Sequence, residues 1–411
     1  MKKALLSLAL VLLVPVLSPG WGFFGHRTIT QVAVYALPSS MQNFYFRHMN
    51  RLVRLCTAPD ERRNDDPAEE SKHYIDMDHF GDNPFGMMPK AYEKAAAKYT
   101  ADTLKKYGTV PWTVLEVKEK LTQAFKEGDT TAILALSADL NHYVADAFVP
   151  LHTTENYDGQ LTKQQGIHSL WESKLPELFI SQYKLDSEKG EYLKDPQAAI
   201  WQVLQESYGF LGATFDIEAE LSKKFSTEKK YVYSHKYGKT RRSYSDAFAK
   251  AYNGSGKNGV GGMVAYRLKG APTMVASFWY TAWKDAGSPD LNKLMRPSKL
   301  SKEEKELFDT QLKAWKDNLL VDQSLLLAMQ KIEAAPAPTD AVGSADGEAP
   351  AAPAPAAPAA ATPASPAATP DAKAPEQPTK VKVKEKKEDG KKEKVKSKKE
   401  DAKKSDDPFG D

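Results

Sequence analysis

The sequence predicts an all-α protein, an orthogonal bundle of helices followed by a tail without regular structure. Apolar residues recur at helical spacing through the body of the chain, residues 21–333, whereas the period-2 alternation typical of strands is hard to find. From residue 334 the composition changes to Ala/Pro repeats and then to a run of lysines. The body, roughly 310 residues, is long enough to bury one large core, so we expect one domain.

The first 20 residues have the pattern of a secretory signal peptide. Two lysines precede an apolar stretch at 4–17, and small residues follow it up to Gly20. Cleavage there would make Trp21 the first residue of a secreted or periplasmic protein. The alternative is an uncleaved N-terminal anchor. No later run of ~18 apolar residues occurs, so we expect no transmembrane segment after signal cleavage.

Several helices can be placed in the body from their start and stop residues. The segment 89–108 begins with a proline and ends at Gly108, and the segment 111–128 likewise begins with a proline and ends with a glycine. Asp129 is a predicted N-cap for a helix that Pro150 stops. The segment 258–283 is more apolar and predicts a core helix, bent or broken near Gly270 and Pro272. Long loops such as 76–88 would connect the helices.

Two segments of different composition follow the body. Residues 334–379 are rich in Ala and Pro and predict an extended linker, and residues 380–411 predict a charged disordered tail. Residues 380–404 hold thirteen lysines against six acidic residues, whereas the body has a net charge of only +1. The tail would either solubilise the protein or contact anionic envelope surfaces or nucleic acid. The near-neutral body by itself shows no electrostatic footprint for a long polyanion.

The single cysteine limits how the fold is stabilised. Cys56 has no partner within the chain, so an exported protein of this sequence has no internal disulfide. Its stability must come from packing or from bound metal. We expect Cys56 to be a small buried core residue.

Two histidine–carboxylate pairs suggest metal chemistry. In "NHYVADAFVPLH", His142 and Asp146 stand four apart, so both side chains lie on one face of a helix. In "GIHSLWESKL", His168 and Glu172 have the same spacing, and His152 lies between the two pairs. Imidazole nitrogens and carboxylate oxygens are ligands that zinc accepts. One such pair alone is weak evidence, because most histidines are solvated or hydrogen-bonded, but three of the eight histidines fall in this short region. No H-E-x-x-H motif occurs.

The motifs "WGFFGH", "PDER", "HYIDMDHF", "HYVADAFVPLH" and "GIHSLWE" resemble, in order and spacing, those of the zinc-dependent phospholipase C and S1/P1 nuclease superfamily. The resemblance covers about residues 21–283. It implies a helical bundle of that type and three zinc ions. The implied metal ligands are Trp21 (through its freed α-amine and carbonyl), His26, Asp60, His73, His142, Asp146, His152, His168 and Glu172. Asp60 is preferred over nearby carboxylates such as Asp65 and Asp66 because of its D-E-x-R context.

The resemblance also implies roles in hydrolysis. Asp146 would bridge two ions that activate a shared water, and Asp60 would also act as general base. Arg63 would stabilise the developing phosphoryl charge, or else form an exposed ion pair with Glu61 or Asp66.

Tyr74 and Asp76 occupy positions where the nucleases stack and read a base, although Tyr74 is equally compatible with a core aromatic. The remaining histidines, His48, His79 and His235, would lie on the surface or in the core.

The substrate is the least determined feature. Glu at position 172 and the short gap from His152 to His168 favour phospholipase C cleavage of a phospholipid head group. Tyr74, Asp76 and the "WGxxGH" start favour a nuclease acting on single-stranded nucleic acid. Phospholipase C is the preferred prediction, with the nuclease as the alternative and a catalytically lapsed zinc-binding envelope protein as a second alternative. Phosphomonoesters and cyclic nucleotides also stay open as substrates. We expect a monomer.

Overall fold

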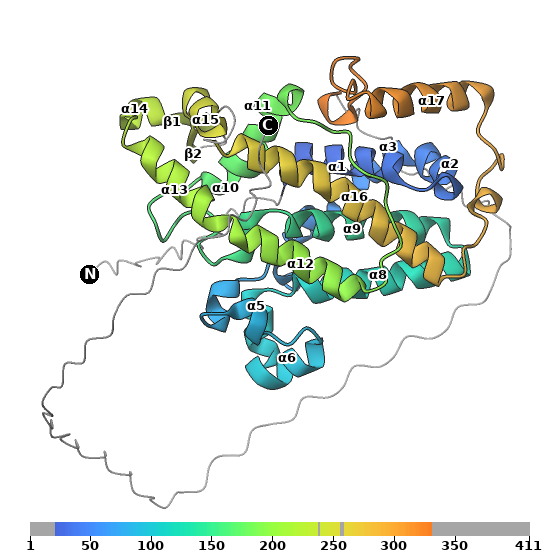
Figure 1. Cartoon of the computed structure of the whole chain (residues 1–411), viewed down its shortest axis with the longest axis horizontal. Coiled ribbons are helices and arrows are strands. Elements are labelled where there is room, and N and C mark those ends of the chain that lie inside the picture. The colour runs from blue at the N-terminus through green and yellow to red at the C-terminus, as the bar shows by residue number, and fades with distance from the viewer. Residues whose placement is uncertain (1–20, 237–238, 255–258, 331–411) are drawn as a thin grey trace, which may run out of the picture. The chain divides into compact units, whose positions relative to one another are not determined.

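The computed structural model describes residues 21–236, 239–254 and 259–330, and these residues are mostly helical (Figure 1). The all-α prediction is therefore confirmed. The predicted signal peptide at 1–20, the linker at 334–379 and the tail at 380–411 lie outside the described residues, and so stay predictions. Within the described residues, no helix is both long enough and apolar enough to cross a membrane.

Four long helices form the centre of the fold: α1 (Phe23–Ala36), α8 (Val110–Glu127), α9 (Thr130–Ala147) and α16 (Gly261–Asp285). Both α9 and α16 contact each of the other three helices. Figure 1 shows α16 crossing over α8 and α9. The start of α9 is fixed by Asp129, whose carboxylate accepts hydrogen bonds from the backbone N–H groups of Thr131 and Ala132 at 2.9 and 3.0 Å. Gly128 ends α8 in a left-handed conformation, φ +70°. Both boundaries were predicted from the sequence.

Shorter elements surround these four helices. Along the chain they are α2 (Ser39–Arg47), α3 (Met49–Leu55), α4 (Ala58–Arg62), η1 (Glu70–Lys72), η2 (Met77–Phe80), α5 (Pro84–Met87), α6 (Tyr92–Tyr99), α7 (Ala101–Tyr107), η3 (Pro150–Thr153), α10 (Ile167–Ser169), η4 (Leu170–Lys174, a π-helical turn), α11 (Leu175–Phe179), η5 (Ile180–Gln182), α12 (Pro196–Gly209), α13 (Leu211–Ser222), α14 (Thr227–Lys230), α15 (Asp246–Asn253), η7 (Leu291–Leu294), α17 (Lys302–Lys316) and η8 (Leu327–Met329).

Two helix predictions need correction. The segment 89–108 forms two helices, α6 and α7, because Thr100 has φ +70° and its hydroxyl caps α7 by accepting from Thr103 N. The segment 258–283 was expected to be a helix bent or broken near Gly270 and Pro272, and α16 runs through both residues without a break. A proline inside a helix removes one backbone hydrogen bond. Here the contacts of α16 with α1, α8 and α9 compensate, and the ring itself is buried. The expected loop 76–88 contains the short elements η2 and α5.

An antiparallel hairpin of two strands, β1 (Tyr231–Lys236) and β2 (Lys239–Tyr244), was missed by the sequence analysis. Its base is anchored by Tyr231 and Tyr244, which pair across the strands and are both buried. Further along the hairpin the side chains of Tyr233 and Arg242 are exposed. The hairpin therefore extends from the core toward solvent.

Cys56 is completely buried, as expected. Burial raises the pKa of its thiol to about 12, so the thiol stays protonated and unreactive at neutral pH.

Candidate metal centre

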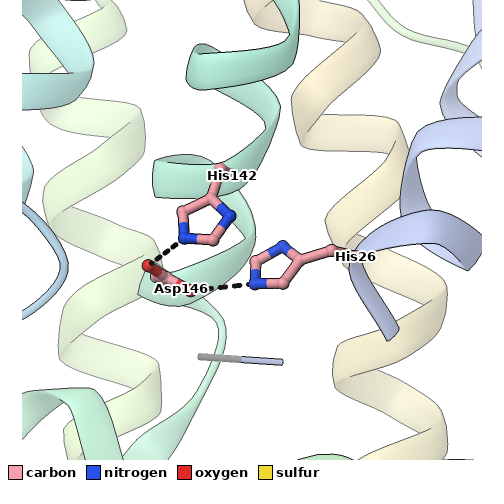
Figure 2. A group of neighbouring side chains, drawn as sticks. All are labelled: His26, His142 and Asp146. Carbon is pink, nitrogen blue, oxygen red and sulfur yellow. Dashed lines mark ion pairs between the residues drawn. The ribbon is translucent and has the colours of Figure 1, made fainter. Parts of the chain in front are cut away.

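Seven helical or turn elements position the predicted ligands, which come from distant parts of the chain. His142 and Asp146 lie on the last turns of α9, and His26 lies on the first turn of α1. Figure 2 shows these three side chains converging, two from α9 and one from α1. The other ligand candidates are Asp60 on α4, His73 directly after η1, His152 on η3, His168 on α10 and Glu172 on η4.

Two groups of potential ligands share His142. In one, His26 Nε2 lies 3.4 Å from Asp146 Oδ1, and His142 Nε2 lies 3.4 Å from Asp146 Oδ2. In the other, His142 Nε2 lies 3.6 Å from Asp60 Oδ1 and 3.1 Å from His73 Nδ1. His73 Nδ1 is also 2.9 Å from Asp146 Oδ2, so Asp146 lies between the two groups. Two ligands on one tetrahedral zinc ion are about 3.3 Å apart, close to the spacing of these atoms.

The third group lies on the chain that follows α9. His168 Nε2 is 2.9 Å from Glu172 Oε2, and His152 Nε2 is 3.7 Å from the same oxygen. The π-helical turn η4 holds Glu172, so its side chain projects toward both histidines. All three residues are buried.

Backbone carbonyls determine which nitrogen of two histidines faces the centre. His142 Nδ1 donates to the carbonyl of Cys56 at 2.8 Å, and His152 Nδ1 donates to the carbonyl of His73 at 2.6 Å. A carbonyl can only accept, so in the neutral ring each Nε2 is left unprotonated with its lone pair toward the carboxylates. This arrangement is typical of histidines that bind a metal.

The electrostatics of the first two groups favour a cation. Burial lowers the pKa of His26 to about 4, so this imidazole is neutral. Burial also opposes charge on His142, but Asp146 and Asp60 outweigh it and raise the pKa of His142 to about 9. Burial would raise the pKa of Asp60, yet the neighbouring charges of His142 and Arg63 lower it to about 2. Ionised carboxylates thus surround a point where positive charge is stabilised.

In the third group burial dominates. It lowers the pKa of His168 to about 4 and raises that of Glu172 to about 8. The raised pKa of Glu172 means that no cation among the described residues offsets the cost of burying its carboxylate.

Unpaired buried atoms test whether these residues fit a metal. Within the described residues, the atoms that are buried without a hydrogen-bond partner include both ring nitrogens of His26 and His168, both carboxylate oxygens of Asp60 and Glu172, Oδ1 of Asp146 and Nε2 of His152. Buried polar atoms without partners are rare and cost free energy. Their concentration at the three groups, with nitrogen and carboxylate donors only, fits divalent zinc.

Comparison with known proteins agrees with this geometry. The family model described as S1/P1 Nuclease matches residues 21–260, more than half of the chain. The chain belongs to the S1/P1 nuclease family. This family is zinc-dependent, and the match indicates that the chain is a phosphodiesterase of the nuclease type. No individual curated protein matches the sequence.

The N-terminal tryptophan of the family match is held firmly. Trp21 is fully buried, its indole Nε1 donates to the carbonyl of Ala145 at 2.8 Å, and its ring lies 5.1 Å from that of Trp171. Ala145 adjoins Asp146, and Trp171 adjoins Glu172. The side chain of Trp21 is therefore anchored beside ligand candidates of two different groups.

A cavity of about 280 Å³ opens directly onto the ligand candidates of this S1/P1 nuclease family member. Its walls include His73, His152 and His168, together with Arg63 and the aromatic rings of Tyr74 and Tyr157. Asp76 also lines it, and burial with the nearby charges of Asp78 and Glu155 raises the pKa of its carboxyl group to about 8. Tyr74 is only half-buried, and its hydroxyl donates to the carbonyl of Lys106 at 3.3 Å.

Arg63 pairs with Asp60, and not with Glu61 or Asp66 as the exposed ion pair predicted as an alternative would require. Arg63 Nη2 lies 3.2 Å from Asp60 Oδ1, and the Arg63 side chain is only 10% exposed. The described residues show no ion pair between Arg63 and Glu61 or Asp66. Arg63 therefore belongs to the wall of the cavity rather than to the solvated surface.

A supporting carboxylate was missed by the sequence analysis. Glu69 is 1% exposed and accepts a hydrogen bond from the hydroxyl of Tyr143, and its Oε1 lies 3.3 Å from Arg62 Nη2. Oε1 also lies 3.7 Å from His73 Nε2. The four-residue spacing of Glu69 and His73 was visible in the sequence, but the short 3-10 turn between them was not.

The three remaining histidines lie outside the groups. His79 is stacked on Tyr107 and lies 2.9 Å from Glu155. His48 is partly buried at the end of α2, and His235 is exposed on β1.

Proposed function

We propose that this protein is a zinc-dependent phosphodiesterase that cleaves single-stranded nucleic acid. The observation that supports this most directly is the cavity, in which two tyrosine rings and an arginine lie beside the ligand candidates. Aromatic rings stack on bases of any sequence, and a guanidinium binds phosphate oxygens. The family match, which is to a nuclease model, supports the same substrate class.

The nine predicted ligands would hold three zinc ions, with the processed amino end of Trp21 completing the group of His26 and Asp146. Zinc bound there would supply positive charge for the phosphoryl oxygens and would lower the pKa of a bound water toward neutrality. The remaining steps belong to side chains. Asp60 stays ionised at neutral pH, so it accepts a hydrogen bond from the attacking water and orients it. Arg63, held against Asp60, is positioned to bind the phosphoryl group as its charge develops.

The base of the nucleotide would occupy the outer part of the cavity. Tyr74 and Tyr157 lie on its walls and would stack on the base. Asp76 would accept or donate a hydrogen bond at the base edge, because a carboxyl group with a pKa of about 8 is largely protonated at neutral pH.

Phospholipase C activity, the preferred prediction from the sequence, is not confirmed by the match to a nuclease model. It stays a second candidate because of Glu172, whose carboxylate lies in the third group where the resemblance associates Glu with phospholipases.

One parallel assay separates the candidates. Purified protein beginning at Trp21 is incubated with single-stranded DNA, with phosphatidylcholine and with phosphatidylinositol, before and after removal of zinc by a chelator. We expect 5′-mononucleotides from DNA, lost on chelation and restored by zinc. Release of phosphocholine without nucleotides would replace the nuclease by the phospholipase. Bound zinc without turnover of any substrate would support the lapsed alternative.

A further inference from the structure

Positive charge is concentrated in one segment of the body. Residues 223–242 contain eight lysines and arginines and a single acidic residue, Glu228, whereas the whole chain has a net charge of only +3. Although the net charge of the body is near zero, the body therefore contains a strongly basic segment. This segment comprises α14, β1 and most of β2.

The hairpin presents two faces of different composition. Cross-strand pairs place Tyr233 opposite Arg242 and His235 opposite Thr240 on the face that begins with the buried pair Tyr231 and Tyr244. Tyr233 is 61% exposed, and Arg242 is also exposed. We call this the tyrosine face. The opposite face bears Val232, Ser234, Arg241 and Ser243.

Neither arginine of β2 forms a close ion pair among the described residues. Among the described residues, no carboxylate oxygen lies within 4.0 Å of the guanidinium of Arg241 or Arg242. Arg242 instead stacks on Tyr231, with its Cζ 4.3 Å from the ring centroid. Its guanidinium keeps hydrogen-bond donors free for an anion.

The tyrosine face joins the metal centre through one loop. Tyr244 donates to the carbonyl of Gln164 at 3.1 Å, and Arg242 donates to the carbonyl of Gln165 at 3.4 Å. The same loop leads into His168, and Asp158 accepts hydrogen bonds from the backbone N–H groups of Gly166 and His168. The hairpin therefore contacts the loop that leads to His168, and His168 lines the cavity.

We propose that the tyrosine face of the hairpin binds single-stranded nucleic acid beyond the cleaved phosphodiester, with Arg242 on a phosphate and Tyr233 stacked on a base. The proposal rests on the proposed nuclease function. An exposed aromatic ring beside an unpaired arginine is the combination that binds single strands without sequence preference. Among the described residues of the hairpin, the large apolar side chains that are exposed are few, Val232 and Tyr233, so a membrane surface is the less suitable partner.

Three single variants test the proposal: Arg242→Ala and Tyr233→Ala on the tyrosine face, and Arg241→Ala on the opposite face as a control of equal charge. KM and kcat are measured on a 20-nucleotide single-stranded DNA and on bis(p-nitrophenyl) phosphate, which is too small to reach the hairpin. We expect Arg242→Ala and Tyr233→Ala to raise KM for the DNA about tenfold. Arg241→Ala should raise it no more than about twofold, an effect that salt removes. Turnover of the small substrate should stay unchanged.

If Arg241→Ala and Arg242→Ala raised KM for the DNA equally, the proposal would be overturned. The positive charge of the hairpin would then attract DNA without a specific contact by Arg242. A parallel fall on both substrates would also overturn it, since Arg242 would then merely support the loop before His168. Binding of labelled DNA, followed by fluorescence anisotropy in the zinc-loaded protein, separates this proposal from the nuclease proposal. If the parent protein binds DNA but does not cleave it, the nuclease proposal is wrong. Weaker DNA binding by Arg242→Ala would in that case still support the binding site on the hairpin. Binding to phosphatidylserine vesicles that depends on Arg242, without DNA binding, would replace nucleic acid by a membrane surface and overturn the proposal.

Discussion

Glu69 Oε1 lies 3.7 Å from Nε2 of His73, the ring nitrogen that faces away from Asp146. The other nitrogen, Nδ1, lies among Asp60, His142 and Asp146. A carboxylate behind a ligating histidine orients the ring and increases its basicity. Glu69 is itself held by Tyr143 and Arg62, so this support is rigid.

Replacing Glu69 by Gln should therefore weaken zinc binding without removing a ligand. We expect a loss of about 10-fold to 100-fold in affinity, measured by competition with a chromogenic chelator. Hydrolysis of bis(p-nitrophenyl) phosphate should fall at limiting zinc and recover at excess zinc. Glu61→Gln, at an exposed position on α4, is the matched control and should leave both unchanged. Zinc affinity equal to that of the parent would exclude this role for Glu69.

The shared residues of the first two groups should be indispensable. His142→Ala removes a nitrogen common to both groups, and Asp146→Asn removes the negative charge between them. We expect each to reduce hydrolysis of bis(p-nitrophenyl) phosphate to background. His235→Ala, on the exposed hairpin, should keep the activity of the parent and controls for loss of a histidine as such. If both variants still hydrolysed the substrate, the proposed metal-dependent mechanism would be excluded.

The sequence predicted the parts of this site that depend on helix geometry. His142 and Asp146 could be placed together because residues four apart share a helix face, and the caps at Gly128 and Asp129 follow from local chemistry. The contact of His26 with His142 depends on how α1 packs on α9, which no local pattern determines, and only the resemblance indicated it.

Other features were decided by tertiary contacts or by unusual backbone conformation. Thr100 adopts φ +70°, which is uncommon for a residue with a β-carbon, and this splits the helix expected over 89–108. The helix containing Pro272 was expected to be bent or broken, and it is not broken, because packing on three neighbouring helices outweighs one lost hydrogen bond. The hairpin was missed because charged residues obscure its alternation, and because Tyr231 and Tyr244 are the only buried pair among the hairpin positions that the structure describes.

The amino end of the processed chain offers a test of the ligand assigned to Trp21. An extra residue before Trp21 would convert the α-amine, with a pKa near 7.7 when free, into an amide that does not bind zinc in this way. We expect the extended protein to retain less zinc than the protein beginning at Trp21, measured by mass spectrometry under native conditions. The fold should persist, because the indole still reaches the carbonyl of Ala145. Unchanged zinc content would show that the α-amine is not a ligand.

Asp76 should make the stability of the zinc-free protein depend on pH. Its carboxyl group has a pKa of about 8 in the folded protein, raised by burial and by the charges of Asp78 and Glu155, whereas an unfolded Asp has a pKa near 3.9. The folded state then binds the proton more tightly, so the free energy of unfolding falls as the pH rises from about 4 to about 8. Asp76→Asn removes this ionisation. In the presence of a chelator, we expect the Tm of the variant to exceed that of the parent by a margin that grows between pH 5 and pH 8.5. A margin that is constant with pH would mean that Asp76 is ionised in the folded protein throughout this range, and that it meets the base edge as a carboxylate that only accepts hydrogen bonds.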